Sequence, residues 1–179
     1  MTQAANVYAQ ALYTLAKDEG LGKTVLEELS VLMEIIAANP AYIKLLSAPD
    51  IPKQERCQVL DETFRGRVHP YVLNFMKILT EKGYVRQFPQ CCECYRSFYN
   101  EDNGILVVKA VSAVALTPAQ TEKLTAKLSR LTGKEIHLRN RIDPTILGGM
   151  RLDYDGRRLD DTVSHRLDTI RDLLKNTVL

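Results

Sequence analysis

The chain has 179 residues, of which 45% are hydrophobic and 26% are charged, with a net charge of +2. This length suits one sizeable domain or two small ones, and so small a net charge excludes the strong positive field typical of nucleic-acid-binding proteins. No apolar run approaches the ~18 residues that cross a bilayer, and the N-terminus lacks signal-peptide and transit-peptide features, so we expect a soluble cytoplasmic protein without direct bilayer insertion.

The first hundred residues are predicted to be helical, because apolar residues recur there at steps of three and four. In the first helix, which ends at Gly20, the apolar positions are Ala5, Tyr8, Ala9, Leu12, Leu15 and Ala16. In the second helix they are Val25, Leu29, Leu32 and Ile36. Asn39-Pro40 ends the second helix, and a short apolar segment at residues 42–46 follows as the third.

Three more helices are predicted before residue 104. Asp50 is expected to cap the fourth, with Pro52 in its first turn. His69-Pro70 begins the fifth helix. Its apolar residues are Tyr71, Val72, Phe75, Met76, Ile78 and Leu79. The sixth ends at Asn103-Gly104 and carries the cysteine cluster at residues 91–94. Six helices joined by short loops predict a compact bundle.

The periodicity changes after Gly104, which predicts a second domain of a different class. Residues 105–114 form an almost wholly apolar, β-branched run that predicts a buried strand. A capping box at Thr117–Gln120 begins a helix that ends at Gly133. Alternating apolar and polar residues then predict strands near residues 136–142 and 150–154.

A closing helix is predicted after the turn signal Asp155-Gly156, with Asp160 or Asp161 as its cap. Its apolar positions are Leu159, Val163, Leu167, Ile170 and Leu174. The predicted fold is therefore mostly α, with an N-terminal six-helix bundle over residues 1–104 and a small α+β C-terminal domain over residues 105–179. The first part carries 11 Lys/Arg against 13 Asp/Glu (−2) and the second 13 against 9 (+4), which suggests different partners.

The Gly148-Gly149 pair invites comparison with a phosphate-binding loop. Such a loop needs more glycines at set spacing, a Lys-Ser or Lys-Thr after them, and a helix that begins at once. Here the alternating residues 150–154 follow instead, so the pair is predicted to lead into a strand.

No catalytic constellation is predicted from the residue pattern. His69, His137 and His165 lie in three different elements. The aspartates at residues 153–161 lack the spacing of a calcium loop. The cluster Cys91, Cys92 and Cys94 lacks the paired ligands of a zinc site. We therefore expect no cofactor, no bound metal, and reduced thiols partly packed in the core.

Surface for a partner helix is the remaining candidate function. Arg139, Arg141 and Arg151 lie on strands, but the aromatic residues that an RNA-reading sheet needs are missing around them apart from Tyr154, so nucleic acid is not expected as a partner. The first helix offers small residues that let another backbone approach, and the fifth is apolar around much of its circumference. A bundle with more apolar faces than neighbours leaves a groove for a partner helix.

Four segments, in order, carry a resemblance that spans essentially the whole chain. They are YAQAL at residues 8–12, NFMKILTEKGYV at residues 74–85, VSAVALTPAQ at residues 111–120 and IDPTILGGMRLDYDG at residues 142–156. These segments resemble the delta subunit family of F-type ATP synthase, the bacterial counterpart of the mitochondrial oligomycin-sensitivity-conferring protein. Tyr84 departs from the family pattern, which more often has an Arg there.

The resemblance implies a non-catalytic stator subunit, present as one copy per complex. Its N-terminal domain would bind the N-terminal helix of an alpha subunit, on the catalytic head, in a groove between helices one and five. Its C-terminal domain would be bound by the b subunits of the peripheral stalk. Together these contacts would resist rotor torque during proton-driven ATP synthesis, at the cytoplasmic face of the bacterial cell membrane.

Two sets of residues follow from this resemblance and the apolar surface. The residues expected to contact the alpha-subunit helix are Ala5, Tyr8, Ala9, Leu12, Val72, Phe75, Met76 and Leu79. A contact residue should be partly exposed without its partner, whereas a core residue should not. The residues expected to shape the C-terminal domain are Asp143, Pro144, Gly148, Gly149 and Gly156.

Two alternatives remain open at this point. The first is a stand-alone helical adaptor protein with another partner. The second is a thiol enzyme that uses the cysteine cluster, which predicts a cysteine with a lowered pKa.

Overall fold

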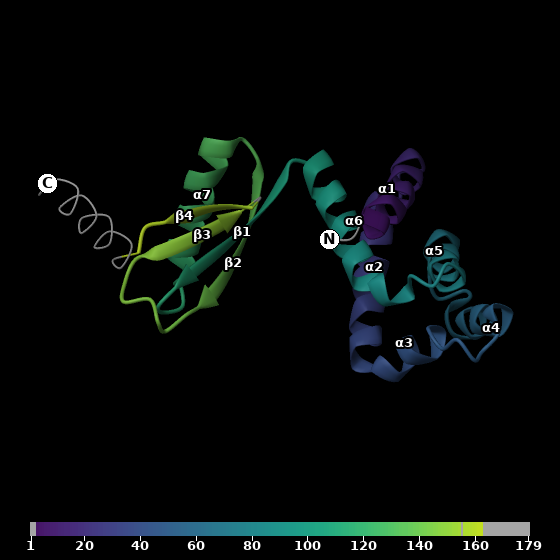
Figure 1. Cartoon of the computed structure of the whole chain (residues 1–179). Coiled ribbons are helices and arrows are strands. Elements are labelled where there is room, and N and C mark those ends of the chain that lie inside the picture. The colour runs from purple at the N-terminus through teal and green to yellow at the C-terminus, as the bar shows by residue number, and fades with distance from the viewer. Residues whose placement is uncertain (1–2, 155, 163–179) are drawn as a thin grey trace, which may run out of the picture. The chain divides into compact units, whose positions relative to one another are not determined.

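The computed structural model describes residues 3–154 and 156–162 (Figure 1). The chain divides between Asp102 and Asn103 into two compact units, which we call the N-terminal unit (residues 1–102) and the C-terminal unit (residues 103–179). The first is helical and the second holds a small mixed sheet, so the mostly α fold class is as predicted.

Six α-helices lie within residues 3–102. They are α1 (Gln3–Asp18), α2 (Gly22–Ala38), α3 (Pro40–Leu46), α4 (Lys53–Phe64), α5 (Pro70–Glu81) and α6 (Phe88–Asp102), with a 3-10 helix, η1 (Val85–Gln87), before α6. Each lies where the apolar periodicity predicts it. Pro40 and Pro70 each stand at the start of a helix, where the missing N–H costs no hydrogen bond.

Helix α1 turns small side chains toward the core and contacts α6. Ala5, Ala9 and Ala16 of α1 are almost wholly buried, and α1 and α6 pack against each other. Two side chains of α1 also hold the end of α6, because the Tyr13 hydroxyl donates to Asp102 Oδ2 (2.8 Å) and Lys17 Nζ lies 2.7 Å from the same carboxylate.

The start of α4 differs from the prediction. Asp50 does not cap this helix, because α4 begins at Lys53 and Pro52 occupies the cap position without a side-chain hydrogen bond. His69 does cap α5, since its Nδ1 accepts from the backbone N–H of Tyr71 (3.3 Å).

The C-terminal unit is built on a four-stranded sheet in the order β2-β1-β3-β4. Its elements are β1 (Ile105–Ser112), α7 (Pro118–Thr132), β2 (Glu135–Ile142), β3 (Met150–Tyr154) and β4 (Arg157–Asp160). Strands β1 and β2 pair in parallel with α7 as the crossover, whereas β1–β3 and β3–β4 pair antiparallel. The predicted capping box is confirmed, because Thr117 and Gln120 exchange hydrogen bonds at the start of α7.

Strand β4 was not predicted, and it corrects the position of Leu159. The prediction placed Leu159 at the start of the closing helix, but Leu159 pairs with Leu152 of β3 instead. The two antiparallel strands follow each other across the tight turn that contains Gly156, at φ +71°. The rest of the predicted closing helix, from Val163 onward, and His165 lie outside the described residues.

The loop from Asp143 to Gly149 joins β2 to β3. The Asp143 carboxylate accepts from the N–H and the hydroxyl of Thr145 (3.1 and 2.6 Å), and these bonds hold its pKa below the usual range. This turn takes in Pro144 and closes where the Ile146 N–H donates to the Asp143 carbonyl (3.1 Å). Gly149 has φ +82°, and Asp161 and Thr162 pack directly on its Cα. The glycine pair thus leads into a strand, as predicted.

Candidate partner-binding surface

Seven of the eight side chains expected to contact a partner helix are buried in the core of the N-terminal unit. They are Ala5, Ala9, Leu12, Val72, Phe75, Met76 and Leu79, none more than 5% exposed. By the exposure criterion stated above, these seven are core residues in the free chain. Only Tyr8 is partly exposed.

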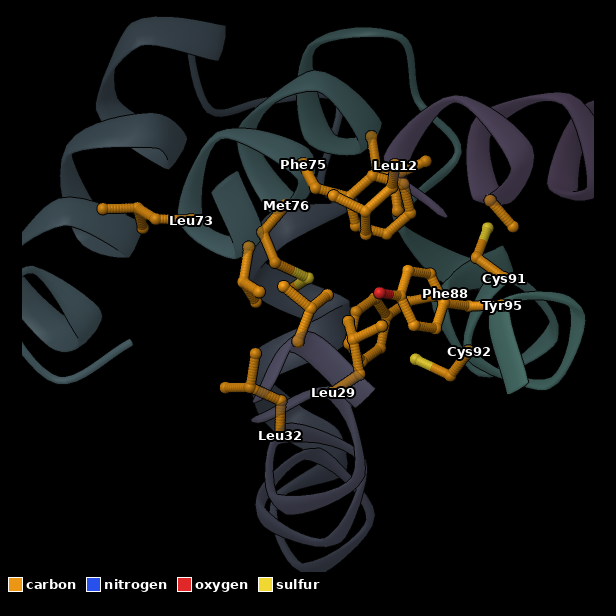
Figure 2. Close-up of a cluster of buried hydrophobic side chains, with 14 of the residues drawn as sticks. Leu12, Leu29, Leu32, Leu73, Phe75, Met76, Phe88, Cys91, Cys92 and Tyr95 are labelled. Atoms are coloured by element: carbon orange, nitrogen blue, oxygen red, sulfur yellow. The ribbon is translucent and has the colours of Figure 1, made fainter. Parts of the chain in front are cut away.

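The reason is visible in the core cluster of the N-terminal unit (Figure 2). Leu12 of α1 and Phe75 and Met76 of α5 point into the same cluster as Phe88 and Tyr95 of α6. The Phe75 and Phe88 rings lie 6.5 Å apart. The centre of each apolar stripe is therefore used by the bundle itself, so a partner has to contact the side chains that flank it.

On α1, four accessible apolar side chains form a second stripe beside the buried one. Ala4, Tyr8, Ala11 and Leu15 follow the spacing i, i+4, i+7 and i+11, which puts them on one side of the helix. Ala4 and Tyr8 are partly buried, Ala11 is exposed and Leu15 is 43% exposed. The sequence contains this spacing, but the prediction placed Leu15 in the single apolar stripe of the first helix.

On α5, the accessible apolar side chains are Tyr71 and Ile78, the latter 43% exposed. They lie seven positions apart on one side of the helix. Just after α5, the Tyr84 ring lies 5.8 Å from the Tyr8 ring of α1 and is itself exposed, while α1 and α5 are in direct contact. We call Tyr8, Leu15, Tyr71, Ile78 and Tyr84 the α1–α5 surface.

The cysteines do not form an activated thiol site. Cys91, Cys92 and Cys94 are all buried. Burial raises the pKa of Cys91 to about 11 and raises that of Cys92 further. The pKa of the half-buried Cys57 is also raised, chiefly by burial and then by the charge of Glu81. A nucleophilic cysteine requires a lowered pKa, so the thiol-enzyme alternative is not supported.

The contacts of the two described histidines, His69 and His137, give neither of them a catalytic partner. The backbone N–H of His69 donates to Glu28 Oε2 (2.7 Å) while its ring caps α5. His137 is exposed on β2 and lies 3.1 Å from Glu135. Within residues 3–154 and 156–162, no three His, Cys, Asp or Glu side chains gather closely enough to hold a metal ion.

The three arginines singled out on strands lie on the sheet face opposite α7, together with Lys109. Arg151 and Arg158 flank Asp153, at 3.4 and 2.9 Å, and these contacts hold the pKa of that carboxyl below its usual range, Arg158 contributing most. Lys109 pairs across the sheet with Arg139, and Arg141 follows two residues later on β2. This face is therefore basic.

None of the described helices is by itself long and apolar enough to cross a bilayer. Helices α2 and α3 meet the requirements of length and composition only as a pair that is bent by 98°.

Comparison with known proteins gives consistent matches over nearly the whole chain. The family model described as ATP synthase delta (OSCP) subunit matches residues 4–174. The chain is 33% identical over 172 residues to the ATP synthase subunit delta of Alkaliphilus oremlandii, covering 96% of each, and 30% identical over 173 residues to that of Lactobacillus gasseri, covering 96% of this chain and 94% of the relative.

Among solved structures, a chain of the mitochondrial ATP synthase hexamer of Toxoplasma gondii has a similar fold, with a TM-score of 0.77, 18% identity, and coverage of 97% of this chain and 98% of that one.

Proposed function

Since this chain belongs to the ATP synthase delta (OSCP) subunit family, we propose that its two units hold two different parts of the same complex. Membership makes it a non-catalytic subunit of the peripheral stalk of F-type ATP synthase, and so a peripheral component of a membrane-bound complex. The stand-alone adaptor is not favoured by these matches.

In this proposal, the N-terminal unit binds the N-terminal helix of an alpha subunit at the α1–α5 surface. The observation that carries it is that Leu15 of α1 and Ile78 of α5 stay exposed on two helices that contact each other, and that the Tyr8 ring of α1 meets the Tyr84 ring just after α5. Large apolar side chains that remain exposed on two adjacent helices suit the apolar side of an amphipathic helix. Tyrosines are well suited to such interfaces, because they offer apolar area together with a hydroxyl group.

The C-terminal unit, in turn, binds the b subunits of the peripheral stalk. Its support is the family resemblance together with the net charge of +4 over residues 105–179, against −2 over residues 1–104. Lys109, Arg139 and Arg141 give the sheet an exposed basic face, which suits an acidic partner segment. One copy of the chain would then join head and stalk on the cytoplasmic face of the bacterial membrane and resist rotor torque.

The first prediction tests the N-terminal assignment with the full chain and a peptide of the alpha-subunit N-terminus from the same source. Leu15→Asp or Ile78→Asp is expected to weaken binding about tenfold or more, because a charge would be buried against an apolar partner. Isothermal titration calorimetry measures the affinity, and circular dichroism checks that the variants stay folded.

The matched control is Val31→Asp on α2, which adds the same charge at an exposed apolar residue outside the α1–α5 surface and should leave the affinity unchanged. Equal affinity for all four proteins would place the peptide elsewhere. No binding to the unsubstituted chain would remove the head-binding assignment.

A further inference from the structure

Strand β2 is the longer of the two edge strands of the sheet. It has eight residues and pairs with β1 in unbroken register over all of them, from Glu135 to Ile142. Strand β4, at the opposite edge, has only four residues. Within residues 3–154 and 156–162, no strand pairs with the outer side of β2 (Figure 1). An edge of this length without a neighbouring strand is where an extended segment of another chain can add one.

The backbone groups of β2 alternate between β1 and the outer side of the sheet. The N–H groups of Glu135 and Asp143 donate to carbonyl groups of β1 and of the residue before it, both at 2.9 Å. The odd-numbered residues therefore direct their backbone groups toward β1. Because the pairing is parallel, the residues between them direct their N–H and C=O groups outward. Asn140 and Ile142 are two of these residues.

The second half of β2 is the accessible part of this edge. All four residues from Arg139 to Ile142 are exposed, and Ile142 is 52% exposed. In the first half, Ile136 is buried and Leu138 is partly buried against the leucines of α7. A partner can therefore reach the outward backbone groups of Asn140 and Ile142 most easily.

The charges along this half of the edge are basic. Arg139 and Arg141 lie on the face opposite α7, and Lys109 pairs with Arg139 across β1 and β2. The acids at the two ends of the strand, Glu135 and Asp143, already bond to neighbouring side chains. A second copy of β2 at this edge would bring arginines close to arginines, which is unfavourable. The same arginines favour a segment that carries acidic side chains.

We propose that residues 139–142 of β2 accept an extended acidic segment, which adds a fifth strand to the four-stranded sheet. The segment bonds to the outward backbone groups. It carries Asp or Glu beside Arg139 and Arg141, and an apolar residue on the other side, next to Ile142. The segment belongs to a b subunit, which rests on the proposed binding of b subunits to the C-terminal unit.

Hydrogen exchange measured by NMR tests the proposal on the full chain, with and without a soluble fragment of the b subunit from the same source. The outward amides of Leu138, Asn140 and Ile142 are expected to exchange about tenfold or more slowly in the complex. The amides of Arg139 and Arg141 face β1 in both states and serve as the internal reference. Nuclear Overhauser effects between backbone protons of the fragment and of β2 identify the added strand.

Ile142→Pro tests the backbone pairing directly. It removes one outward N–H but no hydrogen bond to β1, because proline is tolerated at an edge where the N–H faces away from the sheet. Ile142→Ala is the matched control, since it shortens the same side chain and keeps the N–H. Ile142→Pro should weaken binding of the fragment about tenfold relative to Ile142→Ala, because a carbonyl of the fragment loses its donor. Overhauser effects between β1 and β2 check that each variant keeps the sheet.

Three results would overturn the proposal. If the fragment binds while the outward amides keep their free exchange rate, or while the two variants bind equally, the added strand is wrong and the C-terminal unit remains the stalk-binding unit. If the fragment does not bind the unsubstituted chain, the b-subunit assignment falls together with the proposal. If exchange in the free chain slows as protein concentration rises, a second copy is the occupant of this edge.

Discussion

Gly149 combines two constraints that no other residue type satisfies. Its φ of +82° lies in the left-handed region, where a side chain costs about 1–2 kcal/mol. A Cβ there would also overlap the backbone of Asp161 and come within 2.9 Å of Thr162 Cα. Backbone atoms cannot swing aside as a flexible side chain can, so the segment after β4 would have to move.

We therefore expect Gly149→Ala to destabilise the C-terminal unit by more than the backbone penalty alone. Gly133→Ala supplies the comparison, since Gly133 has φ +68° but nothing within 4 Å of its Cβ position. Gly133→Ala should cost about 1 kcal/mol, and Gly149→Ala clearly more, in urea unfolding followed by circular dichroism. Equal costs would show that the Asp161 contact imposes no constraint.

At the scale of elements, α6 and the adjacent part of α1 carry buried thiol and phenol groups whose pKa values are raised. Burial raises the pKa of Cys91 to about 11 and raises those of Cys92 and Tyr95 as well. Burial, followed by the hydrogen bond to Asp102, raises the pKa of Tyr13 to about 12. These groups are neutral in both states at neutral pH. The unfolded chain loses their protons first as pH rises, so folding stability should fall.

The third prediction is that the melting temperature of the N-terminal unit decreases between about pH 9 and pH 11, the interval between an ordinary thiol pKa and that of Cys91. Thermal melts followed by circular dichroism measure it. Cys91→Ala should flatten this slope, whatever its effect on stability at pH 7. A melting temperature independent of pH over the interval would contradict the prediction.

How far the sequence predicts these elements depends on their length and signals. Helices α1, α2, α5 and α6 are 12 to 17 residues long, so each shows several turns of apolar periodicity, and Gly20 and Gly83 are clear stop residues. Strand β4 has four residues with one apolar position, Leu159, which fits the period of a helix as well as that of a strand. Periodicity therefore identified the long elements and missed the short one.

The same limit explains the candidate site. Periodicity marks the apolar side of a helix, but the width of the buried strip depends on which neighbours pack against it. Leu12 and Phe75 lie at the centre of their stripes and are core, while Leu15 and Ile78 lie at the edges and stay exposed. Only tertiary packing separates these two groups.

For the whole molecule, two compact units with separate proposed partners should act as a bridge. We predict that the full chain binds the alpha-subunit peptide and a soluble b-subunit fragment at the same time. Analytical ultracentrifugation should detect the ternary complex. Leu15→Asp should remove only the peptide, and the double variant Arg139→Glu and Arg141→Glu only the b fragment, because the substitutions lie in different compact units.

Lys123→Glu on α7 reverses an exposed charge away from the basic sheet face and serves as the control for the second variant. Loss of both partners from either variant would show that the two interactions are not separable.

The pairing of β1 has a consequence for the order in which the chain is made. Strand β1 lies between β2 and β3, so it can pair only after later residues are synthesised. Ile105 pairs with Glu135, and Lys109 pairs with Asp153. By contrast, every helix that packs in residues 3–102 has been synthesised before β1 begins. At about 5–20 residues per second, the ribosome completes residue 102 roughly 3–12 s before residue 160. The helical unit therefore has time to fold at the ribosome while the sheet still lacks its strands.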